Sequence, residues 1–160
     1  MSILKVDTIN EKTSGNGVYI AGHVVQVVSS LKAPTSITTT SNSFTATGHS
    51  LSITPTSSSS KILLMLNGGG HYIPTATTMA VVTIYRDSTN IGHATHGLES
   101  SYSTSGSQFS LNPHSLSIID SPSTTSAITY QTYMKTASGT YQYHLTDRGS
   151  INFVAMEIAQ

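Results

Sequence analysis

The feature that most limits the fold of this chain is a repeated alternation of apolar and hydroxyl side chains over short runs. Residues 51–54 and 115–118 both show it, and Gly, Pro, Ser or Asn closes most such runs. Residues 61–66, KILLML, read as a buried strand, and residues 79–86 carry apolar side chains on both faces, as a central strand does. About ten short strands with regular turn signals predict an all-β, two-sheet sandwich, with a jelly-roll-type topology as the leading case.

Serine and threonine dominate the composition. The chain of 160 residues contains 27 Ser and 24 Thr, against 7 Lys plus Arg and 7 Asp plus Glu. Thr favours strands and Ser favours turns, so this excess indicates a β protein with a hydroxyl-rich surface. Disorder is disfavoured because apolar runs recur throughout. The formal net charge is zero and the basic residues are scattered, which predicts no nucleic-acid partner.

Other sequence features narrow the class of protein further. The absence of cysteine rules out disulfides, thiolate metal sites and cysteine nucleophiles. Lys5 and Asp7 interrupt the first apolar patch, so we expect no signal peptide. The run KILLML is far shorter than the ~20 apolar residues of a membrane span, so we expect no membrane insertion. These features predict synthesis in a cytoplasm.

The first thirty residues differ from the rest in pattern. Two short apolar runs flank Gly15-Asn16-Gly17, a sequence that tolerates positive φ, which predicts two strands around a turn. Two strands alone are marginally stable, so this pair needs a partner. We therefore predict an appendage of N-terminal strands over residues 1–30 and a sandwich domain over residues 31–160.

Seven histidines are the first candidates for a metal site. His93 and His96 are close enough in sequence to supply two ligands from one loop, but neither Cys nor a spaced carboxylate accompanies them. A trimer with this loop near its axis would supply the missing ligands from other chains. The interpretation favoured by the sequence is nevertheless that the protein holds no metal and no cofactor.

Catalytic patterns are weak in this sequence. No Gly-x-Ser-x-Gly elbow marks one of the serines as a nucleophile. A pair of carboxylates for glycoside cleavage is the strongest enzymatic alternative, with Glu99 and Asp120 among its candidates. Asp120 stands beside turn residues, where a carboxylate commonly binds its own backbone. We therefore predict a protein that is not an enzyme.

Four polar or aromatic residues are candidates for contact with a receptor. Tyr72 and Tyr102 fall near predicted loops, and His93 and His96 lie within one. An exposed tyrosine ring can stack on a sugar while its hydroxyl forms a hydrogen bond, and loops commonly carry binding residues. These four residues predict a surface that contacts a glycan or a protein.

Several passages, taken together, resemble tail-fibre and related virion proteins of bacteriophages, particularly those that infect marine bacteria and cyanobacteria. The N-terminal passages are LKVDTINEKTSGNGVYI and GHVVQVV, and the central ones are SITPTSSSSKILLML and TIYRDSTNIG. The C-terminal ones are IIDSPSTTSAITYQTYMKTASGT and FVAMEIAQ. The resemblance covers most of the chain outside residues 87–110.

The resemblance implies a homotrimer with an intertwined β stem and a jelly-roll head similar to tumour-necrosis-factor or C1q domains. It places the last strand near the threefold axis and has the N-terminal strands intertwine. The predicted trimer-interface residues are therefore Ile151, Phe153 and Ala155 of the last strand and Val18 and Ile20 of the N-terminal strands. Which face of that last strand points to the axis stays open at this point. The N-terminal strands are expected to bind other virion proteins, and the loops to contact a host surface glycan or protein.

The function expected from this resemblance is that of a structural protein on the virion surface, a trimeric tail fibre or fibre tip. Two alternatives share the fold. One is a capsid decoration protein, either a cement protein or a head fibre, and the other is a free, lectin-like glycan-binding module. A glycan-cleaving enzyme that uses Glu99 or Asp120 is the third class.

Overall fold

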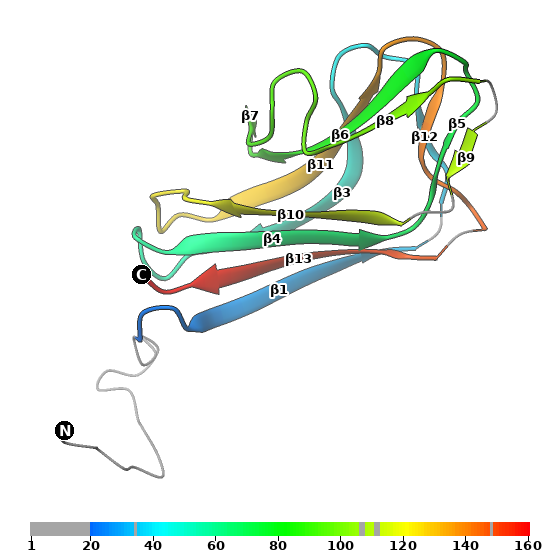
Figure 1. Ribbon diagram of the computed structural model, residues 1–160. Coiled ribbons are helices and arrows are strands. Elements are labelled where there is room, and N and C mark those ends of the chain that lie inside the picture. The colour runs from blue at the N-terminus through cyan, green and yellow to red at the C-terminus, as the bar shows by residue number, and fades with distance from the viewer. Residues whose placement is uncertain (1–19, 34, 106–107, 111–112, 148) are drawn as a thin grey trace, which may run out of the picture.

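The computed structural model describes residues 20–33, 35–105, 108–110, 113–147 and 149–160, with the backbone alone for 108–110. All regular elements in these residues are β-strands, paired antiparallel (Figure 1). None of them is a helix long and apolar enough to cross a membrane. The strands are β1 (Val24–Lys32), β2 (Ile37–Thr39), β3 (Thr45–Ile53), β4 (Lys61–Gly68), β5 (His71–Ile73), β6 (Thr78–Arg86), β7 (Thr89–Asn90), β8 (Glu99–Ser103), β9 (Gln108–Ser110), β10 (His114–Asp120), β11 (Ile128–Thr136), β12 (Tyr141–His144) and β13 (Ile151–Ile158).

Nine of these strands form two facing sheets. The first sheet has the order β1-β13-β4-β10, and the second has the order β3-β11-β6, with β8 and the two-residue β7 both paired to β6. Counted along the chain without β7, the eight strands pair first with eighth, second with seventh, third with sixth and fourth with fifth. This is a long hairpin wound into two sheets, which is the jelly roll. The prediction of an all-β jelly-roll sandwich is confirmed.

A third, smaller sheet closes one end of the sandwich. Its order is β2-β12-β5-β9, and each of its strands comes from a different connection between the two large sheets (Figure 1). The other three connections, at residues 54–60, 87–98 and 121–127, lie at the opposite end of the strands they join. The two ends of the molecule are therefore built differently, one from paired backbone and the other from loops.

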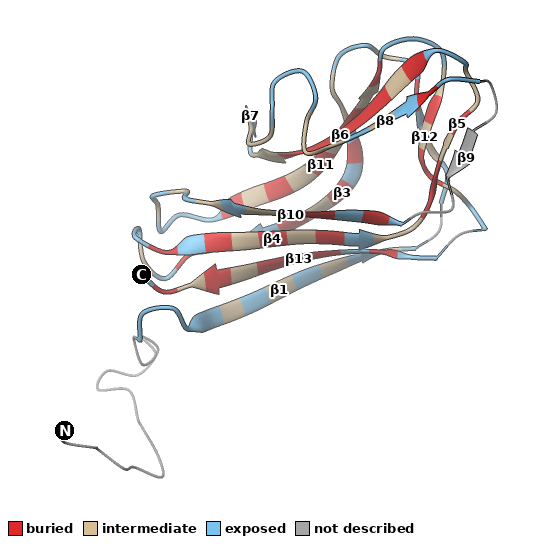
Figure 2. Ribbon diagram, in the orientation of Figure 1, coloured by how far each residue is buried: buried red, intermediate tan, exposed pale blue. Residues whose placement is uncertain are grey.

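The core lies between the two large sheets, and strict alternation supplies it. In β4, Ile62, Leu64 and Leu66 are fully buried, whereas Leu63 and Met65 on the other face are partly exposed (Figure 2). The prediction that residues 61–66 are buried as a whole was therefore wrong for one face. Strand β6 is central as predicted, since it lies between β11 and β8 and most of its side chains are buried.

The burial pattern of β13 shows which face of the last strand is buried. Ile151, Phe153 and Ala155 are 0% exposed and belong to the core cluster of the single chain. These three predicted interface residues thus have no surface left for a second chain. Asn152, Val154 and Met156 point the other way and are partly or fully exposed.

The predicted domain boundary at residue 30 falls inside a strand. Strand β1 pairs with β13 from Val24↔Ile158 to Lys32↔Ile151, so residues 24–30 are part of the sandwich. Ahead of it, the Gly22 amide donates to the Ala159 carbonyl at 2.8 Å, which ties the start of the described chain to the end of β13. Residues 1–19, which include most of the predicted N-terminal strands, lie outside the described residues.

Glu157 is a buried carboxylate that joins three segments at the loop end. Its Oε2 accepts a hydrogen bond from Gln26 Nε2 at 2.5 Å, and its Oε1 accepts two from Thr56, one from the amide and one from the hydroxyl, both at 2.8 Å. Burial alone would raise the pKa of Glu157, but the hydrogen bonds from Gln26 and Thr56 outweigh it and lower that pKa. The charged form therefore fixes the 54–60 connection against β1 and β13.

We predict that Phe153→Ala lowers the free energy of unfolding by about 3–5 kcal/mol, because it leaves a cavity in a packed core. Val154→Ala, one residue along on the outer face, is the matched control and should cost less than about 1.5 kcal/mol. Urea denaturation at a fixed chain concentration measures both values. Equal costs would contradict the assignment of the two faces of β13.

We also predict a pH dependence that Glu157 carries. Because its pKa is lowered in the folded state, its contribution to stability is complete above the unfolded pKa of about 4.3 and is lost as the pH falls through the folded pKa. Urea denaturation between pH 6 and pH 3 should therefore show a smaller loss of stability in Glu157→Gln than in the wild type. Parallel curves for the two proteins would show that Glu157 does not contribute.

Candidate functional site

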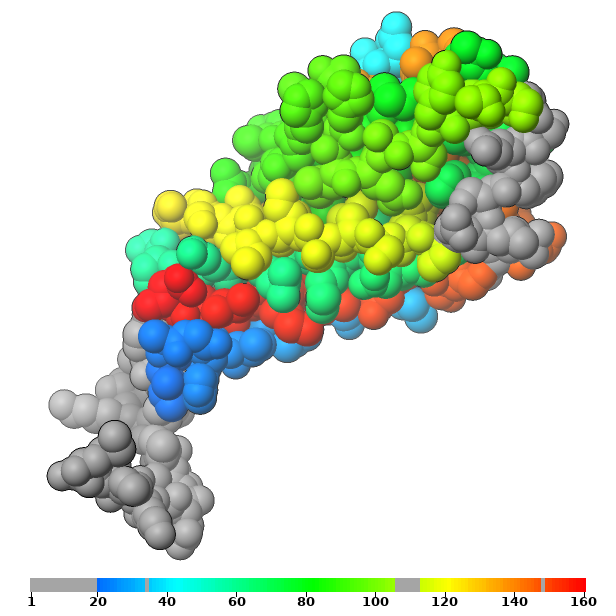
Figure 3. Space-filling model, in the orientation of Figure 1, coloured from blue at the N-terminus to red at the C-terminus, as the bar shows by residue number. Residues whose placement is uncertain are grey.

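The outer face of the first sheet carries a row of apolar side chains that no part of the described chain covers. Val27 of β1 pairs with Met156 of β13, Met156 with Leu63 of β4, and Leu63 with Ile119 of β10. Val27 is 57% exposed and Ile119 is 55% exposed, at the two edges of the sheet. We call these four residues the aliphatic row. It crosses all four strands, which lie side by side at the surface in Figure 3.

The surroundings of the aliphatic row are apolar or hydroxylic. The next outward row contains Val154 and Met65 between two serines, and Leu31 beyond them is 70% exposed. All outward positions of these four strands are described, and Lys61 at the loop end is the one charged side chain among them. A continuous apolar surface on one sheet face is typical of a protein–protein contact.

The outer face of the second sheet is built differently. Tyr85 stacks on Tyr133 with ring centroids 4.0 Å apart, and Phe44 meets Tyr85 edge-on at 6.0 Å. The Lys135 ammonium lies 4.4 Å from the centre of the Phe44 ring. On this face the aromatic rings pack against one another and carry a nearby charge, whereas the outer face of the first sheet carries the aliphatic row.

The predicted receptor-contact residues do not gather at one end of the sandwich. Tyr72 lies in β5, a strand of the small sheet that belongs to the connection before β6. His93 and His96 lie in the 87–98 connection after β6. Tyr102 is 57% exposed on β8, opposite Met79 of β6 on the outer face of the second sheet. Tyr102, His93 and His96 are thus exposed at the second sheet and its connection, and Tyr72 is separate from them.

His93 has a structural role in its own loop. Its Nδ1 accepts hydrogen bonds from the backbone amides of Thr95 and His96, both at 3.1 Å, and a bridge between His93 and Gly97 closes the turn. With Nδ1 as acceptor, the ring proton is on Nε2, which leaves no lone pair there for a metal. The geometry therefore argues against a metal site at His93 and His96, the pair that was considered from the sequence and not favoured.

The two carboxylates considered for glycoside cleavage are occupied by separate partners. Asp120 on β10 accepts two hydrogen bonds of 2.9 Å from Arg86 Nη1 and one of 2.6 Å from the Tyr130 hydroxyl. Burial and the hydrogen bond to Asp120 raise the pKa of Tyr130, so its hydroxyl stays a donor. This cluster links β10 of the first sheet to β6 and β11 of the second.

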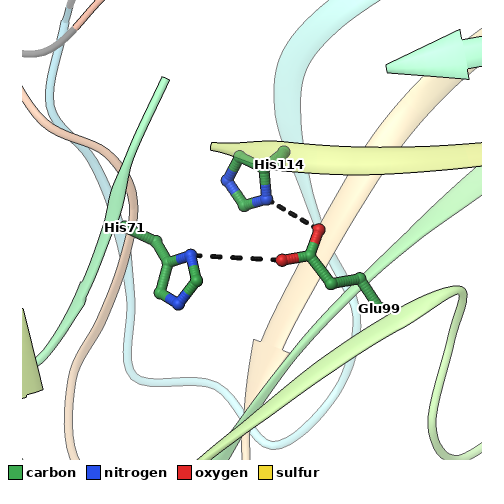
Figure 4. A group of neighbouring side chains, drawn as sticks. All are labelled: His71, Glu99 and His114. Atoms are coloured by element: carbon green, nitrogen blue, oxygen red, sulfur yellow. Dashed lines mark hydrogen bonds and ion pairs between the residues drawn. The ribbon is translucent and has the colours of Figure 1, made fainter. Parts of the chain in front are cut away.

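Glu99 belongs to a different cluster, with two histidines. Its Oε2 lies 2.8 Å from His114 Nδ1, and its Oε1 lies 4.0 Å from His71 Nδ1 (Figure 4). One ligand atom from each of the three residues lies within 4.8 Å of the others. His71 and His114 are buried and the Glu99 side chain is 22% exposed, so the group is nearly enclosed.

Neighbouring groups fix both imidazole rings. His114 Nε2 lies 2.9 Å from the Tyr143 carbonyl oxygen, and the Tyr143 ring stacks on the His114 ring at 4.7 Å. The His71 ring meets the Tyr141 ring edge-on at 5.9 Å. Burial, together with the nearby His114, lowers the pKa of His71 despite the opposing effect of Glu99, so the His71 ring is neutral at neutral pH.

This cluster was not predicted from the sequence, because its three residues lie on three different strands and have no characteristic spacing along the chain. The one available signal was the alternation in residues 114–118, which puts His114 on the same face as Leu116 and Ile118 and hence inside. Of the predicted interface residues, Ile20 is 39% exposed and available for contact, while Val18 lies outside the described residues.

Comparisons with known proteins return structural likenesses alone. Neither the protein-family descriptions nor the curated proteins contain a match to the sequence. The VP2 subviral particle of infectious bursal disease virus matches with a TM-score of 0.47 and 10% identity, over 98% of this chain and 37% of that one. The T13 particle of the same virus matches with a TM-score of 0.43 and 12% identity, over 98% of this chain and 40% of that one.

This chain therefore spans about two fifths of the length of the chains that it matches. TM-scores below 0.5 do not establish a common fold. The jelly-roll topology accordingly rests on the strand pairing of this chain itself.

Proposed function

We propose that this chain is a non-enzymatic structural protein of a bacteriophage virion, a homotrimeric tail fibre or fibre tip that contacts the host surface. The single observation that carries the self-association is the aliphatic row on the outer face of the first sheet. The virion role and the threefold symmetry rest on the sequence resemblance to phage tail-fibre proteins.

The aliphatic row favours association because its exposure is costly. Fully burying a Val, Ile, Leu or Met side chain contributes about 1.5–3 kcal/mol, and Val27 and Ile119 keep more than half of their surface in water within one chain. Leu31, 70% exposed on the same face, adds to the area available. A partner that covers this face recovers that free energy.

The chemistry of the face fits a second copy of the same chain. Two copies of a surface meet without repulsion only where like charges are absent, and Lys61 stands at the end of the face, outside the aliphatic row. Isologous and cyclic contacts are the usual route by which soluble proteins cover such a surface. Among the described strands, β1 also forms an edge of its sheet, where an adjoining chain could pair with its backbone.

Burial of the first sheet in a trimer leaves the second sheet facing outward. Tyr102 is exposed there, and the loop with His93 and His96 leads into the same strand β8. An exposed tyrosine beside hydroxyl-rich and histidine residues suits a glycan or protein surface. We propose these three residues as the host-contact candidates; Tyr72, in the end sheet, forms a separate one.

The same observation is compatible with a capsid decoration protein, in which the face would join copies on the head of the particle. A free lectin-like module would use Tyr102 without joining a particle. These two alternatives differ from the tail fibre in location, so location is what the functional experiment must measure.

We predict that the protein sediments as a trimer, with three times the chain mass of 16.9 kDa. Val27→Asp and Ile119→Asp, each on an edge strand, should shift it toward monomer, because an unpaired carboxylate in an apolar contact costs several kcal/mol. Ser52→Asp, exposed on the second sheet, is the control and should leave the trimer intact. Circular dichroism checks that all three variants fold. A monomeric wild type, or trimers of both row variants, would contradict the proposal.

We further predict that gold-labelled antibody against this chain marks the tail of the phage particle in electron micrographs. Labelling spread over the head would instead support the decoration protein. Particles that carry no label, from a preparation in which the free protein is detected, would refute a virion role and favour the lectin-like module.

A further inference from the structure

The cluster of His71, Glu99 and His114 presents three metal-ligand atoms to one point inside the molecule. Strand β5 supplies His71, β8 supplies Glu99 and β10 supplies His114, and in Figure 4 the Nδ1 atoms of both histidines face the carboxylate. Around a tetrahedral zinc ion with bonds of about 2.0–2.1 Å, ligand atoms lie about 3.4 Å apart. The separations of 2.8 Å and 4.0 Å run to the two different oxygens of the Glu99 carboxylate, and one ligand atom of each residue lies within 4.8 Å of the others, so small side-chain movements reach that spacing.

His114 is oriented as a metal ligand would be. Its Nε2 faces the Tyr143 carbonyl oxygen at 2.9 Å, an acceptor that requires the ring to donate a proton from Nε2. That tautomer leaves a lone pair on Nδ1, directed at the centre of the cluster. Histidines that bind metals commonly donate the opposite ring N–H to a backbone carbonyl or carboxylate in this manner.

His71 provides an independent observation. The residue is 5% exposed, and its Nδ1 is a buried atom with no hydrogen-bond partner. The nearest acceptor in the cluster, Glu99 Oε1, lies 4.0 Å away, which is beyond hydrogen-bond distance. A buried polar atom without a partner costs about 1–3 kcal/mol, and an ion at the centre of the cluster would provide the missing partner.

An ion pair without metal accounts for only part of this arrangement. A doubly protonated His114 would donate to Glu99 and to the Tyr143 carbonyl, and both bonds would be satisfied. His71 would still point an unpaired nitrogen at the carboxylate. A metal accounts for all three residues at once.

We propose that His71, Glu99 and His114 form a binding site for a zinc-like divalent transition-metal ion, one per chain. Two imidazole nitrogens and one carboxylate oxygen form a donor set that zinc accepts, and three protein ligands leave a fourth position for water. Calcium and magnesium prefer sites made of oxygen atoms, so the two nitrogens select against them. The site is distinct from the loop pair His93 and His96.

The ion would act as a cross-link between parts of the fold that are otherwise weakly joined. Strand β10 is an edge of the first sheet, β8 pairs only with β6 among the described strands, and β5 belongs to the end sheet. One ion therefore ties both large sheets to the small sheet that closes the end of the sandwich. Binding to the folded state alone stabilises it by mass action.

The first test is metal content and affinity of the full chain, purified, stripped with chelator and titrated with Zn²⁺ or Co²⁺. The expected result is one ion per chain, with Co²⁺ giving the visible absorption bands of a tetrahedral nitrogen and oxygen site. Glu99→Gln keeps the shape and one acceptor of the carboxylate, and His71→Ala removes the unpaired nitrogen. Each should weaken binding at least about 100-fold, more than the 10–100-fold typical of residues behind the ligands.

The matched controls are His23→Ala, an exposed histidine, and the double variant His93→Ala/His96→Ala, which removes the loop pair. Both should keep the wild-type affinity and stoichiometry. Loss of binding in the loop double variant, or unchanged binding in Glu99→Gln and His71→Ala, would overturn the site. Absence of Zn²⁺ and Co²⁺ binding to the wild type would show that the cluster is an ion pair only.

The second test measures stability and does not depend on how well the variants fold. Free Zn²⁺ at about 100 times its dissociation constant should raise the midpoint of thermal unfolding of the wild type by about 5–10 °C. Ca²⁺ and Mg²⁺ at the same concentration should not raise it. An equal shift with all three ions, or none with Zn²⁺, would contradict the proposal.

Discussion

A sheet that is apolar on both faces is the constraint on which the rest of this structure depends. Strands β4 and β13 have apolar side chains at consecutive positions, so the period of two directs one set inward and the other outward. The second large sheet covers the inner set, which includes Leu64 and Phe153. The outer set forms the aliphatic row, which no other described residue of the chain covers. The described strands thus close the core within one chain, while the outer face of the first sheet stays exposed.

At each end of the sandwich, polar side chains join segments that strand pairing does not connect. Glu157 fixes the 54–60 connection, and Asp120 links the two sheets through Arg86 and Tyr130. At the other end, the histidine cluster brings together three strands from three sheets. Buried polar groups of this kind contribute when each has its partners and are costly otherwise. That asymmetry is why the unpaired nitrogen of His71 supports the proposed metal site.

The fold could be predicted from the sequence further than the site could. Alternation and turn residues are local, so the all-β sandwich and the central position of β6 followed from them directly. Which face of β13 is buried depends on the partner sheet, and Ile151, Phe153 and Ala155 were therefore assigned to an interface that they do not reach. The extent of β1 depends on its pairing with β13, which also lies far away in sequence. The cluster of His71, Glu99 and His114 forms only through tertiary contacts. The sequence therefore offered His93 and His96, the two histidines closest in sequence, as the candidate metal ligands instead.

If other copies of the chain cover the outer face of the first sheet, that face is protected from chemical reagents in the native assembly. Because the chain has no cysteine, Ser117→Cys and Ser52→Cys each introduce a unique thiol, one on this face and one on the outer face of the second sheet. Both serines are exposed within a single chain. In the native assembly, we expect a thiol reagent to modify the cysteine at position 117 at least about tenfold more slowly than the cysteine at position 52. After unfolding, we expect the two cysteines to react at equal rates. Equal rates in the native protein would contradict this proposal.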